Sequence, residues 1–171
     1  MRFAGNIILL LLLCSSLYSQ VSGEETEFAK KVLEAFKQKD YGSYKKLCVT
    51  HQDYIDEILP DLKAEAKRMG HRFSFQDVDA IYTPSHLDSL NLGVFRMIKG
   101  QGTKAGIKDW NKMEFDRFEL LDGAQQKKEK TIYGNIWFTY NHETFGLYAL
   151  MIEKFASGYH VFFIRGIGKQ K

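Results

Sequence analysis

Residues 131–140 read TIYGNIWFTY, and residues 145–155 read FGLYALMIEKF. Both runs are rich in β-branched and aromatic residues, and short polar stretches lie on either side of them. This composition is typical of β-strands joined by turns. Two more runs of the same kind, Met113–Leu121 and Tyr159–Ile167, flank them. The end of the chain therefore predicts an antiparallel meander.

The part of the chain before the meander has helical periodicity. Residues 24–39 carry apolar side chains at positions that share one helical face, which predicts an amphipathic helix. Ser43 is placed to cap a short second helix, and Thr50 with Asp53 forms an imperfect capping box for a third. Because Pro60 lies inside the third pattern, we expect a kink there or a helix that restarts with Pro60 in its first turn.

The middle of the chain changes its period twice. Residues 71–82 begin with an alternating pattern that predicts a strand or an extended segment, and residues 85–99 return to helical spacing. Gly100, Gly102 and Gly106 then predict a flexible connection to the meander. Helices first and a sheet last predict an α+β fold, in which N-terminal helices pack on a C-terminal antiparallel sheet.

The strands of the predicted meander are apolar on both faces. In residues 145–155, Phe145 and Leu147 fall on one side of the strand and Tyr148 falls on the other. A single layer of helices explains the burial of only one face. We therefore expect the second face to meet a pocket, a partner subunit or more of the chain, with residues 85–112 as the segment that could fold over it.

The N-terminus predicts a secretory signal peptide. Residues 7–13 are an unbroken aliphatic run behind a short basic start, and the small residues Ser19 and Gly23 each fit a cleavage site. The sequence does not choose between these two positions. We assign residues 1–22 to the signal peptide and residues 23–171 to one domain.

Two alternatives to a cleaved signal peptide are open. The apolar run is shorter than the roughly 20 residues needed to span a bilayer, which disfavours an uncleaved anchor. Cys14 could be the acylated residue of a lipoprotein, although the bulky Leu13 before it fits that motif poorly. We therefore expect a secreted or periplasmic protein without a membrane span after signal removal.

Composition narrows the class of protein. The chain has 171 residues, of which 44% are hydrophobic, and this content predicts a buried core and argues against a disordered chain. Its 24 basic and 21 acidic residues are interspersed, and the formal charge of +3 does not predict nucleic-acid binding. Removal of the signal peptide leaves Cys48 as the one thiol, so no internal disulfide can form. Its apolar neighbours predict a buried side chain.

No local motif predicts a particular enzyme chemistry. The sequence has no nucleophile elbow, no zinc-binding helix and no Cys-x-x-Cys pair, and we expect neither a metal nor a cofactor. We expect Asp77 and Asp79 to face solvent. His142 should lie in a turn, and His160 should be a structural histidine held by hydrogen bonds. The candidates for proton transfer are Asp77, Asp79, Asp109, His86, His142 and His160.

Polar residues embedded in apolar strands point to a binding site. Asn135, Glu153 and Arg165 each lie between large apolar residues on their own strand face. Because burying such a charge alone is costly, Glu153 and Arg165 should either pair with each other or line a wet cavity. The candidate ligand-binding residues are Trp110, Tyr133, Asn135, Trp137, Glu153 and Arg165. In the alternative interpretation Trp137 belongs to the core and Trp110 is a plug from the inserted segment.

The order of the predicted elements resembles that of the NTF2-like superfamily, whose fold is an α+β cone. The resemblance rests on the first amphipathic helix, a break at residues 39–41, a short helix with Tyr44 and Leu47, a further helix and the terminal meander. It covers nearly all of residues 24–168. It implies a curved sheet wrapped around the first helix, a cavity at the open end of the cone, and frequent dimerisation through the sheet.

These observations favour an exported, non-catalytic binding module with a cone-shaped pocket for a small molecule or a protein partner, which could form a homodimer through its sheet. The first alternative is a small cofactor-independent enzyme, an isomerase, dehydratase or hydrolase, that uses an Asp/His pair in the cone. The second is an interaction domain with a filled cone. An apolar cavity would favour binding, and a cavity with two convergent titratable groups would favour the enzyme.

Overall fold

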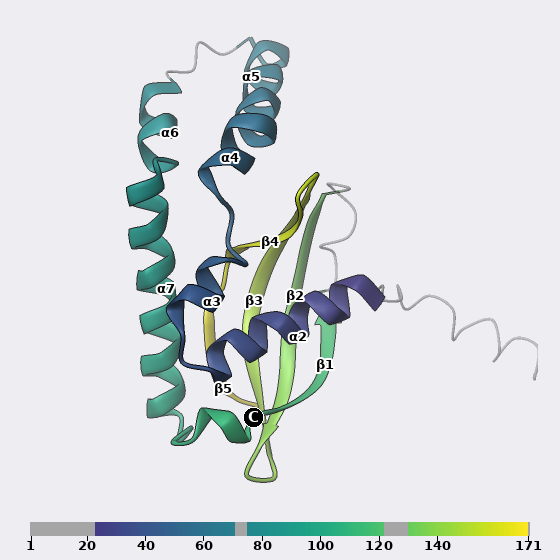
Figure 1. Cartoon of the computed structure of the whole chain (residues 1–171). Helices are drawn as coiled ribbons and strands as arrows, with labels where there is room; N and C mark the ends of the chain where they lie inside the picture. The colour runs from purple at the N-terminus through teal and green to yellow at the C-terminus, as the bar shows by residue number, and fades with distance from the viewer. Residues whose placement is uncertain (1–22, 71–74, 122–129, 171) are drawn as a thin grey trace, which may run out of the picture.

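The computed structural model describes residues 23–70, 75–121 and 130–170, so the expected signal peptide lies outside the described residues. Helices come first and an antiparallel sheet last, which confirms the α+β class (Figure 1). The helical elements are α2 (Gly23–Lys37), α3 (Tyr41–Lys45), α4 (His51–Asp53), the π-helical η2 (Tyr54–Ile58), α5 (Leu59–Arg68), α6 (Phe75–Ile81), α7 (Pro84–Lys104) and the 3₁₀ turn η3 (Trp110–Lys112). The strands are β1 (Glu114–Leu120), β2 (Thr131–Tyr140), β3 (Glu143–Phe155), β4 (Gly158–Phe163) and β5 (Gly166–Lys169).

The sheet is the predicted meander with one difference at its end. Strands β1, β2, β3 and β4 are neighbours in that order, and β5 pairs with the other half of β3. The run expected as one strand over Tyr159–Ile167 is therefore two strands. The chain leaves the ladder at the fully buried Ile164, and the Arg165 N–H then donates to Tyr148 O (3.1 Å). Because β3 bulges at this level, one straight strand cannot stay hydrogen-bonded to β3 along its whole length.

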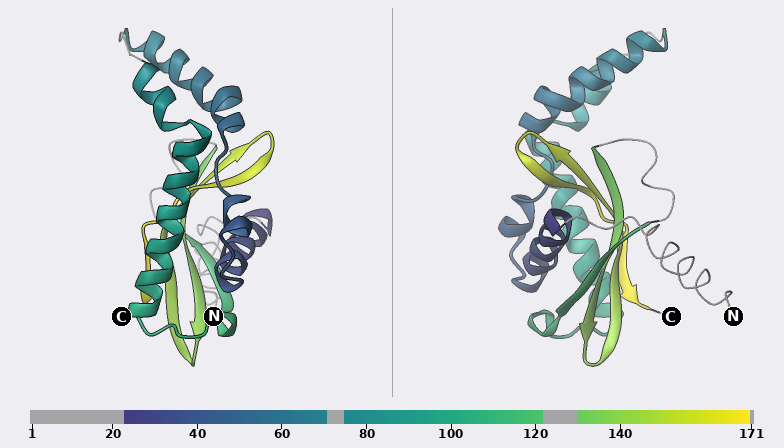
Figure 2. Two further views of the ribbon diagram at one scale, coloured as in Figure 1. Left: turned by 60° about the vertical axis from the view of Figure 1, so that its left-hand side comes forward. Right: turned by 90° about the vertical axis from the view of Figure 1, so that its right-hand side faces the viewer.

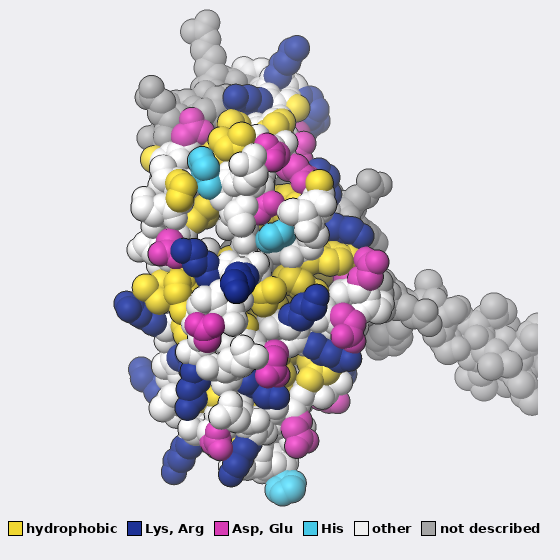
Figure 3. Space-filling model, viewed as in Figure 1, with side chains coloured by type: hydrophobic (Ala, Val, Ile, Leu, Met, Phe, Trp, Pro, Cys, Tyr) yellow, Lys and Arg dark blue, Asp and Glu magenta, His cyan; other side chains and the backbone are white. Residues whose placement is uncertain are grey.

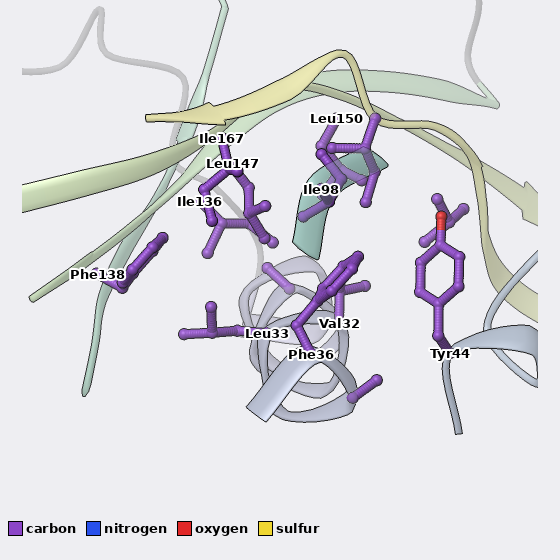
Figure 4. Close-up of a cluster of buried hydrophobic side chains, with 14 of the residues drawn as sticks. Val32, Leu33, Phe36, Tyr44, Ile98, Ile136, Phe138, Leu147, Leu150 and Ile167 are labelled. Carbon is purple, nitrogen blue, oxygen red and sulfur yellow. The ribbon is translucent and has the colours of Figure 1, made fainter. Parts of the chain in front are cut away.

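Helix α2 confirms the predicted first helix and covers one face of the sheet. Figure 4 shows Leu33 and Phe36 of α2 pointing toward Ile136 on β2 and Leu147 on β3. All four side chains are at most 2% exposed. Each such side chain contributes about 1.5–3 kcal/mol relative to an exposed one. These packed side chains fill the part of the concave face that α2 covers.

Two of the predicted helix starts have well-defined caps. The cap of α3 is Asp40 and not the expected Ser43, because the Asp40 carboxylate accepts hydrogen bonds from Gly42 N (2.9 Å) and Ser43 N (3.1 Å). A charged acceptor at this position is stronger than a hydroxyl. The capping box of α4 is complete, with reciprocal bonds between Thr50 and Asp53.

Helices α4, η2 and α5 run on into one arm that projects beyond the sheet, with α6 beside it (Figures 1 and 2). Pro60 lies in the first turn of α5, as one of the two sequence expectations had it. The preceding turn is π-helical, an arrangement that is frequent at functional sites. No helix in the described ranges is both long and apolar enough to cross a membrane.

The strand expected over residues 71–82 is wrong. Residues 75–81 form helix α6, and residues 71–74 lie outside the described residues. Val78 and Tyr82 are four residues apart, a spacing that a helix also satisfies. The Tyr82 ring stacks on Tyr54 of η2 at 4.2 Å, so the partner of this segment is a helix and not a strand edge.

The flexible connection expected through the glycines is also wrong. Helix α7 continues through Gly100 and Gly102 to Lys104. Gly102 is needed there because a Cβ atom at this position would lie 2.6 Å from two ring atoms of Trp110. Gly106 follows the helix with a φ of 103°, a left-handed value that glycine adopts without strain.

The second face of the sheet meets different groups at its two ends. Near one end the ring of Trp137 packs edge-on against Tyr148 (5.6 Å), and Gly146 leaves room for both, since a Cβ atom there would lie 2.9 Å from either ring. At the other end η2 and α5 face the ends of β2 and β3 across a pocket. Helix α7, from the segment that could have folded over this face, contacts β5 and α3.

Candidate functional site

The expected ligand-binding residues do not form one site. Trp110 lies in the core at 3% exposure, and the Lys99 ammonium lies 3.6 Å from the centre of its ring. Lys99 also donates a hydrogen bond to Phe36 O (3.0 Å), the carbonyl of a residue in the last turn of α2. Trp110 is therefore the core plug of the alternative interpretation, and it presents no aromatic wall to a ligand.

Trp137 and Tyr133 are not in the walls of the two pockets described below. Trp137 is 8% exposed, and its indole Nε1 donates to the Glu119 carboxylate while the Arg117 guanidinium lies 5.3 Å from its ring. Its polar and aromatic contacts are thus made within the chain. Tyr133 is 36% exposed and stands opposite Met151 in the register of β2 and β3.

Glu153 lines a pocket with a volume of about 740 Å³, which separates α5 from the ends of β2 and β3. The Thr131 hydroxyl donates to Glu153 (3.1 Å). Across the pocket, Glu57 of η2 accepts from Ala156 N (2.6 Å) and from the Lys130 ammonium (3.2 Å). Lys130 thus forms an ion pair with Glu57 across the two walls, and a ligand between them would have to break it.

Asn135 and Arg165 both line a second pocket, which has a volume of about 550 Å³. Gln101 of α7, Leu121, Tyr148 and Ala149 complete most of its wall. In the register of β3 and β4, Glu153 lies opposite His160, whereas Arg165 lies beside Tyr148 of β3. At ~3.3 Å per residue, Tyr148 and Glu153 are on the order of 15 Å apart along β3. Glu153 and Arg165 therefore line different cavities and do not pair with each other.

A β-bulge builds the wall of the Arg165 pocket. Gly134 pairs with Leu150 and Ile136 pairs with Leu147, so Asn135 faces two residues of β3. One of these, Ala149, has a φ of 49°, which is costly for a residue with a side chain. The side chain of Asn135 stabilises this turn of the backbone, because its Oδ1 accepts from Ala149 N at 2.9 Å.

The Arg165 side chain is exposed, and no described acid lies within ion-pair distance of it. No ion pair among the described residues includes it. Among the described residues, no Asp or Glu lines this pocket. On the face drawn in Figure 3, by contrast, Lys and Arg side chains alternate with Asp and Glu. An unpaired guanidinium beside a pocket can bind the anionic group of a ligand.

A third cluster joins the β3–β4 turn to the start of α4. The Ser157 hydroxyl lies 2.8 Å from Asp53 Oδ1 and 3.0 Å from His160 Nε2, and His160 Nδ1 lies 3.1 Å from Cys48 O. Burial of Asp53 on its own raises the pKa of its carboxyl. Hydrogen bonds from Thr50 and Ser157, together with nearby His160, outweigh that effect, so the pKa lies below its usual value.

The remaining candidate acids and histidines have structural or solvent-facing positions. Asp79 is exposed as expected, although it lies on a helix and accepts a hydrogen bond from the Tyr54 hydroxyl. Asp109 caps η3 by accepting from Asn111 N (3.2 Å). His142 lies exposed in the β2–β3 turn, and His86 is exposed at the start of α7. The side chain of Asp77 lies outside the described residues.

Neither a metal centre nor a reactive thiol emerges from these residues. Within the described ranges, no group of three or more His, Cys, Asp or Glu side chains is placed to hold a metal ion. Cys48 is 1% exposed, and burial raises the pKa of its thiol to about 12, so it is not a nucleophile at neutral pH.

Sequence reasoning missed several residues of these sites. Gln101 was assigned to a flexible connection, and Ala149 carries no sign in the sequence of its left-handed backbone. Asp53 was identified only as a helix cap, although it also binds Ser157. Asn135 and Arg165 were the signals available for this pocket, because a polar residue inside an apolar strand needs a partner. Comparisons with known protein families, with curated proteins and with solved structures find no match for this chain.

Proposed function

We propose that the protein is an exported, non-catalytic binding module that holds a small polar molecule in the pocket of Asn135 and Arg165. The observation that carries this proposal is the meeting of these two residues, separated in sequence, in one pocket of about 550 Å³ beside the strained backbone of Ala149. Strained backbone persists where the surrounding structure holds it, and it gathers at binding sites. Export rests on the signal peptide expected over residues 1–22.

We also propose that the fold is a variant of the NTF2-like cone. Helix α2 packed on one face of a terminal meander supports this assignment. Helix α6, in place of the early strand, and the projecting arm are departures from that pattern. In this variant the ligand would lie at the bulge of β3, since α2 side chains fill the concave face.

Native mass spectrometry of the purified mature protein tests the binding proposal. We expect a small molecule that stays with the unmodified chain and is lost from Arg165→Ala. The matched control is Arg96→Ala, which removes an exposed arginine of α7 outside the pocket wall. A protein that carries and binds no small molecule, or an Arg165→Ala variant that keeps its ligand, would contradict the proposal.

A second candidate is hydrolysis by Ser157, since its hydroxyl lies 3.0 Å from His160 Nε2. A nucleophilic serine needs a neutral imidazole that accepts its proton. Cys48 O can only accept, so His160 Nδ1 carries a proton. If Ser157 donates to Asp53, then Nε2 must also donate to Ser157, and the imidazole is charged. The complete set of hydrogen bonds therefore fits a structural latch better than a nucleophile.

Labelling with a fluorophosphonate probe separates these two roles of Ser157. The binding proposal expects no labelling of the unmodified protein between pH 6 and 9. Labelling that disappears in both Ser157→Ala and His160→Ala, with Ser43→Ala as the control, would favour the hydrolase. Ser43 is a suitable control because it is exposed and its hydroxyl donates to the Asp40 carboxylate (2.8 Å).

We propose, in addition, that self-association uses the second face of the sheet. Tyr133, Met151 and Phe163 are aligned across β2, β3 and β4, and Tyr133 and Phe163 are 36% and 45% exposed. A charge at Phe163 should shift a dimer towards monomer in sedimentation. Ile164 cannot serve for this test because it is fully buried, and a charge there would unfold the protein. A protein that is monomeric at high concentration would refute this idea.

A further inference from the structure

We propose that the Arg165 pocket selects an acceptor-only anion, namely the carboxylate, phosphate or sulfate group of its ligand. This inference rests on the proposed function and adds the chemical class of the ligand. It starts from the two amide side chains in the pocket wall, Gln101 and Asn135, which could each in principle accept or donate a hydrogen bond.

Both amide oxygens are already used by the backbone. Gln101 Oε1 accepts from Ile167 N at 3.1 Å, and Asn135 Oδ1 accepts from Ala149 N at 2.9 Å. A backbone N–H can only donate, which identifies the atom facing it as the oxygen in each case. Gln101 and Asn135 therefore have their NH₂ groups left to offer a ligand. Arg165 adds five more N–H donors and a positive charge.

Among the described residues, the other side chains of the pocket wall supply no competing carboxylate. The Tyr148 hydroxyl donates to Gly168 O (3.3 Å), so Tyr148 contributes its ring to the wall. The acid closest in register is Glu119, opposite Asn135. Its carboxylate accepts from Trp137 Nε1, and the Arg117 guanidinium lies 3.7 Å away.

Hydrogen-bond matching then decides the ligand class. A cation or a donor-rich neutral group would leave the N–H donors of the pocket without acceptors. Binding such a group would then cost the free energy of removing water from those donors. A carboxylate, phosphate or sulfate has lone pairs for Arg165 and both NH₂ groups, and a guanidinium binds such groups through paired hydrogen bonds. Gly166 keeps this arrangement possible, since a Cβ atom at that position would lie 2.9 Å from Gln101 Oε1.

Two near-isosteric substitutions reverse the polarity of the pocket without removing its backbone bonds. In Asn135→Asp and Gln101→Glu, one oxygen can still accept from Ala149 N or Ile167 N, while the other replaces NH₂ with an acceptor. The control is Asn111→Asp, which makes the same change of charge at an exposed residue of η3 outside the pocket wall. Backbone amide NMR spectra establish that each variant keeps its fold.

The binding measurement follows the Arg165 Nε–Hε signal by NMR during titration with acetate, inorganic phosphate and sulfate, with acetamide and methylammonium as the uncharged and cationic probes. We expect saturable shifts for at least one anion and none for acetamide or methylammonium. Asn135→Asp and Gln101→Glu should each lower the affinity for that anion by about tenfold or more. Asn111→Asp should leave this affinity unchanged. A preference for acetate assigns a carboxylate, and a preference for phosphate or sulfate assigns a tetrahedral anion.

The same experiment separates failure of this inference from failure of the proposed function. Leu121→Trp adds a large ring to the pocket wall and should block every ligand. If a retained neutral or cationic molecule is lost from Leu121→Trp but kept by Asn135→Asp and Gln101→Glu, the anion inference is wrong and the binding function stands. If Arg165 responds to no anion and no molecule is retained, both are wrong.

Discussion

The backbone N–H of Ala149 donates to Asn135 Oδ1 at 2.9 Å, at the position where Ala149 takes a φ of 49°. An amide side chain on β2 thus stabilises a left-handed residue in the middle of β3. The bulge that results lies level with the break between β4 and β5, and the pocket of Arg165 opens beside it. Asn135 therefore links the geometry of the sheet to the candidate site.

Replacing Ala149 with glycine should stabilise the protein. A left-handed conformation costs a residue with a Cβ atom roughly 1–2 kcal/mol, and glycine avoids this cost but loses some entropy on folding. We expect a net gain of about 0.5–1 kcal/mol in the free energy of unfolding, measured with urea. Ala64→Gly, on an exposed position of α5, should instead lose about 1 kcal/mol. Equal losses at both positions would mean that Ala149 is not left-handed in solution.

Two glycines of α7 should respond to alanine with opposite signs. Gly100→Ala meets no atom within 4 Å, so the helix should gain up to about 1 kcal/mol. Gly102→Ala places its Cβ 2.6 Å from the Trp110 ring, and we expect a net loss of about 1–3 kcal/mol. Thermal unfolding of the two variants measures the difference. A stabilised Gly102→Ala variant would show that Trp110 does not pack against α7.

The Asp53 carboxyl should make stability fall in acid. Because its pKa is lowered in the folded state, ionised Asp53 stabilises the protein above the unfolded pKa, ~3.9. That contribution is lost as the pH falls through the lower folded pKa. Asp53→Asn should lose about 1 kcal/mol at neutral pH through its weaker cap, and its stability should fall less between pH 5 and 2. Asp56→Asn, at an exposed residue, is the control. An unchanged acid profile in Asp53→Asn would contradict this assignment.

Lys99 should titrate well below the other lysines. Partial burial, and then the nearby charge of Lys39, lower the pKa of its ammonium to about 8 from 10.5. An NMR titration of the lysine side chains should show one midpoint near this value, missing in Lys99→Met. Since the folded state binds fewer protons than the unfolded state between the two pKa values, this group should make stability rise with pH in that window. A Lys99 midpoint above 10 would refute the burial of its ammonium.

Local patterns in the chain were enough to predict the elements that only one type of secondary structure satisfies. Alternating β-branched and aromatic residues, bounded by turns, correctly predicted β2 and the two hairpins around β3, and the apolar stripe of residues 24–39 predicted α2. The capping box of Thr50 and Asp53 was readable because it is a local hydrogen-bonded motif. Such features depend on neighbours within a few residues, so the chain order contains the information needed.

Where the sequence of a segment suited two structures, contacts with distant parts of the chain selected one of them. Val78 and Tyr82 suit a strand or a helix, and stacking on Tyr54 selects the helix. Gly102 suits a loop or a close contact, and the Trp110 ring selects the contact within α7. The pocket of Arg165 likewise exists only because β3 bulges where α7 brings Gln101 against β5. Contacts between segments distant in sequence set these outcomes, and their energies exceed the weak preferences of single residues.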